Sequence, residues 1–169
     1  MDMKTLRKRC AARIRDLPIP NPFDTQIFAA SVGEGRKRPI VLQSISLHGV
    51  VSGAWAAMES IDIVFYEQHA TPFHQQHIIL HELSHILCEH QGFDFTEEGL
   101  RSLLLADVPI ERLRALQSNH YSDEEEREAE MLASLILERV NNAQADNAIK
   151  DPNISGTLQL LDDLEGMTS

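Results

Sequence analysis

The sequence lacks most of what would mark a secreted or membrane protein. Only two cysteines, Cys10 and Cys88, occur in 169 residues. They are too few for a disulfide framework, and they form no CxxC pair of the metal-binding kind. No apolar run reaches membrane-spanning length, and the charged N-terminus lacks the apolar core of a signal peptide. We therefore expect a cytoplasmic protein without a membrane segment.

Basic residues are also in deficit, with 15 Lys and Arg against 26 Asp and Glu. The deficit is uneven, because residues 1–38 carry 9 Lys or Arg and only 4 Asp or Glu. A chain this acidic overall is a poor candidate for direct nucleic-acid binding, which depends on contacts to phosphates. The basic segment could contact nucleic acid or an acidic partner. It could equally form a solvated helix face that pairs with the protein's own acidic half.

What the sequence does contain is an HExxH motif, which runs from His81 through Glu82 to His85. On a helix, residues i and i+4 share a face, so the two imidazoles can point at one metal ion. Glu82 lies about 100° further round and can reach a water held by that metal. These are the ligands and the base of a catalytic zinc site. The motif would arise by chance in roughly one such chain in thirty. The surrounding sequence is therefore needed to distinguish a zinc site from a chance occurrence.

The surroundings predict a buried helix from Pro72 to Gly92, with Pro in the first turn and Gly at the end. Apolar residues cover most of its surface, and histidines occupy one stripe about 80° wide. A buried stripe of imidazoles needs partners. The alternative is a core helix whose histidines bond to backbone or to each other. Ordinary packing is the better interpretation for three members of the stripe: His74, His77 and Cys88.

A catalytic zinc keeps three protein ligands, and the acidic segment after Ser122 is the obvious source of the third. Ser122 and Glu125 have the spacing of a capping box, and most of the carboxylates can be explained as a solvated helix start. On a helical wheel Glu126 and Glu130 fall at or beyond the edge of the apolar stripe. Glu125 and Glu128 fall within it or at its border, so periodicity does not choose between them. Because Glu125 has a capping role, Glu128 is the better candidate.

A small sheet is predicted ahead of the HExxH helix. Pro39–Ile45 and Ile61–Tyr66 are β-branched and aromatic runs of strand length, and Gly53–Ala57 can form a third strand. An exposed edge could bind an extended peptide by strand addition, although the same runs are explained by an ordinary core. Further helices are expected up to Leu17, around Asp24 to Ser31, from Asp107 to Leu116 and from Thr157 to Leu164.

The length suits a single α+β domain over residues 1–169. We expect a basic helical segment at 1–38, a core at 39–140, and a polar tail at 141–169 with a short helix.

The HELSH sequence is followed some forty residues later by a second segment, Glu-Arg-Glu-Ala-Glu-Met-Leu-Ala from Glu126. The two together resemble the ImmA/IrrE family of zinc metallopeptidase-like proteins, whose members show HE-L-x-H and then E-x-E-A-x-x-F-A. The resemblance covers roughly residues 39 to 138. Leu132 stands where Phe is common, residues 138–140 replace a Met-Pro ending, and residues 65–67 stand where many members have Asn. The chain thus resembles a divergent branch.

The resemblance implies a zincin-like fold, in which a small sheet packs beside the HExxH helix. It also implies a Zn²⁺ ion held by His81, His85 and Glu128, with Glu82 as the catalytic base. Members of the family act on, or work with, helix-turn-helix regulators. A regulatory protein is therefore the expected substrate or partner.

In the resulting mechanism, zinc lowers the pKa of a bound water, and Glu82 accepts its proton. A side-chain donor would stabilise the oxyanion, and Tyr121 is our choice over His120 and Tyr66. The alternative function is a zincin-like binding or toxin–antitoxin module that acts mainly through partner contacts. The intact Glu82 favours the peptidase, because a purely structural site has no use for a base.

Overall fold

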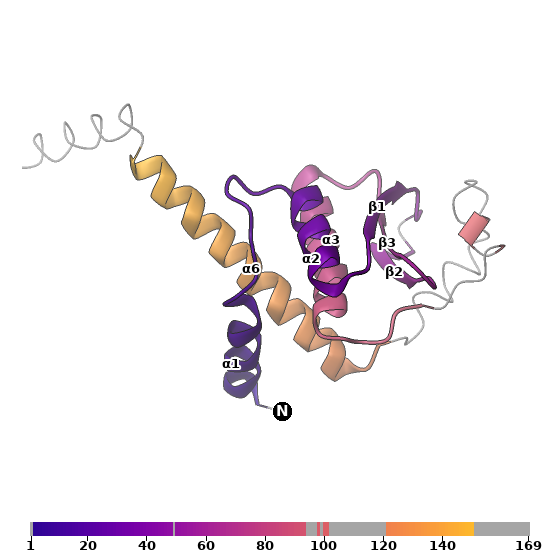
Figure 1. Cartoon of the computed structure of the whole chain (residues 1–169), viewed down its shortest axis with the longest axis horizontal. Coiled ribbons are helices and arrows are strands. Elements are labelled where there is room, and N and C mark those ends of the chain that lie inside the picture. Colours follow the sequence, from indigo (N-terminus) through magenta and orange to yellow (C-terminus); the bar gives the residue numbers. More distant parts are fainter. Residues whose placement is uncertain (1, 49, 94–97, 99, 102–120, 151–169) are drawn as a thin grey trace, which may run out of the picture.

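The computed structural model describes residues 2–48, 50–93, 98, 100–101 and 121–150, and shows an α+β architecture (Figure 1). Four helices and three strands lie within these residues. In chain order they are α1 (Met3–Ile14), α2 (Thr25–Arg36), β1 (Ile40–Ile45), β2 (Gly53–Ala57), β3 (Asp62–Glu67), α3 (Pro72–Leu87) and α6 (Asp123–Lys150). None of the described helices combines the length and the apolar character needed to cross a membrane.

The sheet is mixed and has the strand order β1-β3-β2. β3 is central, parallel to β1 and antiparallel to β2, with Val64 paired to Leu42 on one side and to Trp55 on the other. Side chains of a strand point alternately to its two faces. Val64 accordingly packs in the larger core beneath the helices, whereas Ile63 and Phe65 pack in a smaller cluster on the opposite face.

Acidic side chains cap the two N-terminal helices. The Asp2 carboxylate accepts hydrogen bonds from the N–H groups of Lys4 and Thr5, and Asp24 does the same for Gln26 and Ile27. Such caps satisfy donors that have no partner within the helix. Beyond its cap, α1 buries one stripe at four-residue spacing, formed by Leu6, Cys10 and Ile14.

The HExxH helix α3 begins at Pro72, directly after the Thr71 cap. It ends at Leu87, five residues before the predicted end at Gly92. The chain turns back there through Glu89, which has φ 61°. The N–H of His90 donates to the carbonyl of His85 (3.1 Å), and that of Glu89 donates to Ile86 (3.1 Å). These two bonds form a Schellman C-cap, here without the usual glycine.

The capping box that opens α6 is confirmed. The Ser122 N–H donates to Glu125 Oε2 (2.8 Å), and the Glu125 N–H donates back to Ser122 Oγ (3.3 Å). The helix continues to Lys150, so residues 141–150, which we assigned to a polar tail, are helical. Likewise α2 continues past Ser31 to Arg36. The helices predicted over 107–116 and 157–164 lie outside the described residues.

The elements form three layers, which are the sheet, the α2–α3 pair, and α6 with α1 (Figure 1). α3 is the middle element, because it contacts the sheet on one side and α6 on the other. This explains why the second half of α3, from Ile78 to Ile86, is buried on nearly all sides, whereas its first turns remain partly exposed. Its HExxH residues therefore lie where sheet, α3 and α6 meet.

Candidate metal centre

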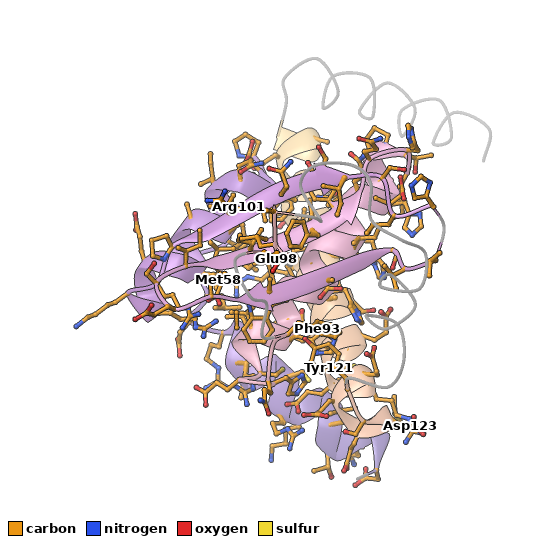
Figure 2. The ribbon with its side chains drawn as sticks, turned by 90° about the vertical axis from the view of Figure 1, so that its right-hand side faces the viewer. Met58, Phe93, Glu98, Arg101, Tyr121 and Asp123 are labelled. Carbon is orange, nitrogen blue, oxygen red and sulfur yellow. The ribbon has the colours of Figure 1, made fainter. Side chains whose placement is uncertain are left out.

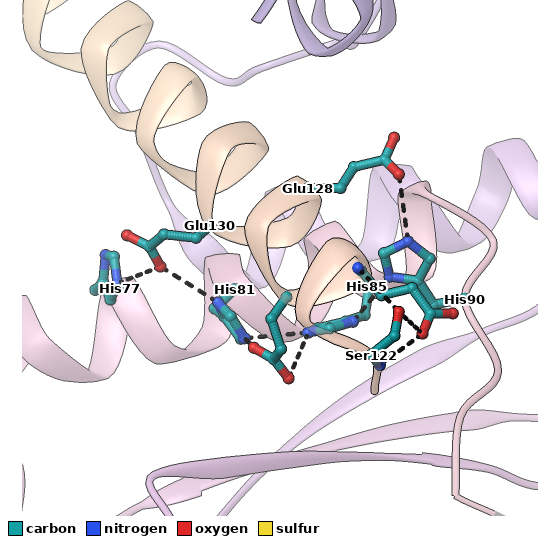
Figure 3. A network of polar contacts seen from close by, with 9 residues as sticks. His77, His81, His85, His90, Ser122, Glu128 and Glu130 are labelled. Atoms are coloured by element: carbon teal, nitrogen blue, oxygen red, sulfur yellow. Dashed lines mark hydrogen bonds and ion pairs between the residues drawn. The ribbon is translucent and has the colours of Figure 1, made fainter. Parts of the chain in front are cut away.

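The HExxH motif lies in the second half of α3 and brings two imidazoles together. The Nε2 atoms of His81 and His85 are 3.1 Å apart. The side chain of His85 is fully buried, whereas that of His81 is 22% exposed. Four-residue spacing puts both rings on one face of the helix, and that face is turned toward α6 (Figure 3).

Helix α6 runs antiparallel to α3 and presents two carboxylates at the same four-residue spacing. Glu126 Oε2 lies 3.3 Å from His81 Nε2, and Glu126 Oε1 lies 3.9 Å from His85 Nε2. One turn further, Glu130 Oε2 lies 3.4 Å from His81 Nδ1 and 3.4 Å from His77 Nε2. Because both helices repeat at 3.6 residues per turn, matching i, i+4 pairs form a ladder of imidazoles and carboxylates.

The donor atoms of His81, His85 and Glu126 fit a zinc ion. Tetrahedral zinc with ligands at 2.0–2.1 Å separates its ligand atoms by about 3.3 Å. The two imidazole Nε2 atoms are 3.1 Å apart, and Glu126 approaches them with different oxygens, Oε2 at 3.3 Å from His81 and Oε1 at 3.9 Å from His85. One donor atom from each of the three residues lies within 4.8 Å of the other two. Two imidazoles and a carboxylate form the donor set of many catalytic zinc sites. The fit therefore follows from both distance and chemistry.

Glu82 lies beside this group and is buried, with 6% of its surface exposed. Its Oε2 atom has no hydrogen-bond partner among the described residues. Burial is the main reason that its pKa rises to about 7; the His81 charge opposes the rise and Glu126 adds to it. A buried carboxylate without a full set of partners is costly, which is typical of a group kept for chemistry rather than stability.

Negative charge surrounds the imidazole of His81. Burial alone would lower the pKa of this imidazole, but the hydrogen bond to Glu126 and the charges of Glu82, Glu126 and Glu130 outweigh burial and raise it. Three carboxylates around one imidazole form a strongly negative region. Such a region favours a bound cation.

The structure brings Glu126, and neither Glu125 nor Glu128, to the two imidazoles. Glu125 is the capping partner of Ser122. Glu128 is buried on another side of α6, where its Oε2 lies 2.6 Å from Arg9 of α1. Residues 126 and 128 differ by about 200° around a helix, so Glu128 lies on another face of α6, beside α1 and His90. The matching i, i+4 spacing of Glu126 and Glu130 was the sequence signal that could have identified the ligand-bearing face.

Of the three candidate oxyanion donors, Tyr121 lies at the site. Its ring stacks on that of His85 with centroids 3.6 Å apart, and Phe93, Tyr121 and Asp123 follow one another along this side of the molecule (Figure 2). Burial, followed by the charge of Glu82, raises its pKa, so the phenol stays protonated and able to donate. Tyr66 packs against the main core instead, and His120 lies outside the described residues.

The site opens into a cleft of about 1050 Å³ between β2, α3 and the start of α6. Edge strand β2 forms one wall. Its far end is covered, because Ala57 and Trp55 exchange backbone hydrogen bonds with Phe93. The near end of β2 borders the cleft together with the site residues: Gly53, Ala54, His81, Glu82, Tyr121 and Glu126.

The chain matches no protein-family model, and comparisons with curated proteins and with solved structures give no significant match. The relation to the ImmA/IrrE family therefore stays a prediction that depends on the two motifs alone.

Proposed function

We propose that the protein is a zinc-dependent peptidase of narrow specificity, with a zincin-like arrangement of sheet and HExxH helix. His81, His85 and Glu126 would hold the ion. The single observation that carries the proposal is the buried carboxylate of Glu82 beside these three donors, in the lining of an open cleft. A structural zinc site uses four protein ligands and has no need of such a base.

Zinc bound there would lower the pKa of a water and polarise a carbonyl group. Glu82 accepts the proton of the attacking water and passes it to the leaving amine. In the metal-free protein its pKa of about 7 already lies near the working pH of a general base. Tyr121, protonated and at the cleft wall, supplies a donor for the oxyanion.

The substrate would bind as an extended chain. The near end of β2 is an edge that borders the cleft, and an edge strand offers backbone groups for strand addition. A regulatory protein of the helix-turn-helix type is the substrate class that the motif resemblance implies. Phe93 covers the far end of β2. This limits the length of strand edge that a peptide can pair with, which is consistent with a narrow specificity.

The test uses purified full-length protein loaded with zinc and a proteome-derived peptide library, with new termini detected by mass spectrometry. Wild type should bind one zinc ion and cleave a small set of sequences. Glu82→Gln should keep the zinc and lose the cleavage, whereas His81→Ala combined with His85→Ala should lose both. Equal cleavage by wild type and Glu82→Gln would contradict the catalytic role. Zinc binding without any cleavage by wild type would favour a binding module that acts through partner contacts.

A further inference from the structure

A second imidazole lies directly behind the metal-site residue His85. His85 directs Nε2 toward His81, and its other nitrogen, Nδ1, lies 2.9 Å from Nδ1 of His90 (Figure 3). The Nε2 atom of His90 then lies 3.5 Å from Oε2 of Glu128. The Schellman turn at the end of α3 creates this arrangement, because it folds the chain back and brings residue 90 beside residue 85.

Only one arrangement of protons is consistent with a metal on His85. A ligand imidazole binds with an unprotonated nitrogen, so His85 Nδ1 must carry the proton and donate it. His90 Nδ1 must then accept, which places the proton of a neutral His90 on Nε2. That nitrogen faces the Glu128 carboxylate, which can only accept. Each group therefore fixes the tautomer of the next.

The protein largely shields the side chains of His85, His90 and Glu128 from water. The exposed fraction of the side chain is 0% for His85, 6% for His90 and 10% for Glu128. Hydrogen bonds in such a medium are electrostatically stronger than in water. A substitution of Glu128 should consequently alter zinc binding at His85, although the Glu128 side chain faces away from the metal site.

Helix α1 holds the carboxylate of Glu128 in place. Arg9 approaches its Oε2 at 2.6 Å, and Arg13 Nε lies 3.8 Å from its Oε1. Arg13 also donates to the carbonyl of Leu87 at the end of α3 (2.8 Å). Cys88, His90 and Glu128 lie close enough to hold a second metal ion, but two guanidinium groups beside the carboxylate disfavour a cation there.

We propose that His90 and Glu128 are positioning residues for the metal ligand His85. They fix its tautomer and ring orientation, and Arg9 and Arg13 orient Glu128 from α1. This proposal rests on the proposed zinc site. It gives the basic N-terminal helix a role in metal affinity from outside the cleft. Outer-shell partners of this kind contribute roughly 10- to 100-fold to metal affinity.

The experiment measures zinc affinity of the full-length protein by competition with a chromophoric chelator, and the visible spectrum of the cobalt(II)-loaded protein. We expect His90→Phe and Glu128→Gln to weaken zinc binding by roughly 10- to 100-fold and to alter the cobalt bands. His90→Gln should recover most of the affinity, because its amide can accept from His85 and donate to Glu128. The control Glu138→Gln alters an exposed carboxylate of α6 and should leave both readouts unchanged.

The outcomes separate the two proposals. If wild type binds no zinc, the metal site itself fails. If wild type binds and His81→Ala does not, unchanged affinity and spectra in His90→Phe and Glu128→Gln would overturn the positioning role. Complete loss of zinc in Glu128→Gln, equal to that in His81→Ala, would also overturn it and make Glu128 a ligand. Should His90→Phe fail to fold, Glu128→Gln and His90→Gln still decide the question.

Discussion

A Cβ atom added to Gly53 would lie 3.0 Å from Oε1 of Glu82 and 2.5 Å from a methyl group of Ile78. The edge strand and the HExxH helix are thus in contact at the proposed base. The φ of Gly53 lies outside the left-handed region, so glycine is not needed there for its backbone conformation. It is needed because there is no space for a side chain. Strand β2 therefore limits how the Glu82 side chain can be placed in the cleft.

Gly53→Ala should lower the cleavage rate about 10- to 100-fold, because the new methyl group would clash with the Ile78 side chain and crowd the Glu82 carboxylate, so that Glu82 shifts from its position. Zinc affinity should change little, since none of the three ligand side chains is among the nearest neighbours of the added Cβ, and Ile78 meets it with the end of a flexible side chain. The measurement is the rate on the best peptide of the library together with bound zinc. Gly35→Ala is the matched control: nothing lies within 4 Å of its added Cβ, so it should leave the rate unchanged. A full rate in Gly53→Ala would show that Glu82 tolerates displacement.

Glu126→Ala should reduce zinc affinity more than Glu130→Gln does. Glu126 faces both imidazoles, whereas Glu130 contacts Nδ1 of His81 and only orients that ring. Loss of an orienting partner costs roughly 10- to 100-fold, and loss of a ligand should exceed this. Chelator competition measures both, with Glu138→Gln as the unaffected control. The reverse order would assign the ligand role to Glu130.

Much of the fold could be predicted from the sequence, because local patterns determine it. The β-branched and aromatic runs predicted β1 and β3, the short run 53–57 predicted β2, and the capping box predicted the start of α6. The end of α3 was misplaced, since the left-handed C′ residue is Glu89 rather than a glycine. Gly92, which was interpreted as the helix end, instead packs on Trp55, where a Cβ would lie 2.8 Å from the indole.

The choice of carboxylate required tertiary information. α6 packs against both α3 and α1, so its buried arc is broader than the face that meets the histidines. Glu128, which we preferred because Glu125 has a capping role, is buried, with 7% of its surface exposed, but its side chain faces α1. The site-facing Glu126 lies at the edge of the arc, with 48% of its side chain exposed. A helical wheel shows which side chains are buried and not which neighbour they meet.

The stability of the metal-free protein should depend on pH through Glu82. Its folded pKa of about 7 lies above the ordinary 4.5, so ionisation costs the folded state stability as pH rises through this window. Glu82→Gln removes the cost. Its stability relative to wild type should therefore increase by about 3 kcal/mol between pH 4.5 and 8. Urea unfolding with a chelator present, repeated across this range, measures the difference.

Glu67→Gln provides a control of opposite sign. Burial would raise the pKa of Glu67, but hydrogen bonds from the N–H groups of His69 and Leu47 outweigh it and lower the pKa. Its ionised form therefore stabilises the fold above the ordinary pKa. Glu67→Gln should lose stability relative to wild type as pH rises. Parallel curves for Glu82→Gln and wild type would contradict the buried, uncompensated state of Glu82.

Asp62→Asn should destabilise the protein by about 3 kcal/mol. Asp62 is fully buried at the start of β3, where it accepts from the Trp55 indole (3.0 Å) and pairs with Arg38 (3.1 Å) and Arg36 (3.6 Å). Removing one partner of a buried pair costs 3–5 kcal/mol. The lower end applies because both arginines remain about one-third exposed. Glu138→Gln, which breaks an exposed pair with Arg7, should cost at most about 1 kcal/mol. Urea unfolding compares the two variants, and equal losses would show that Asp62 does not anchor the sheet.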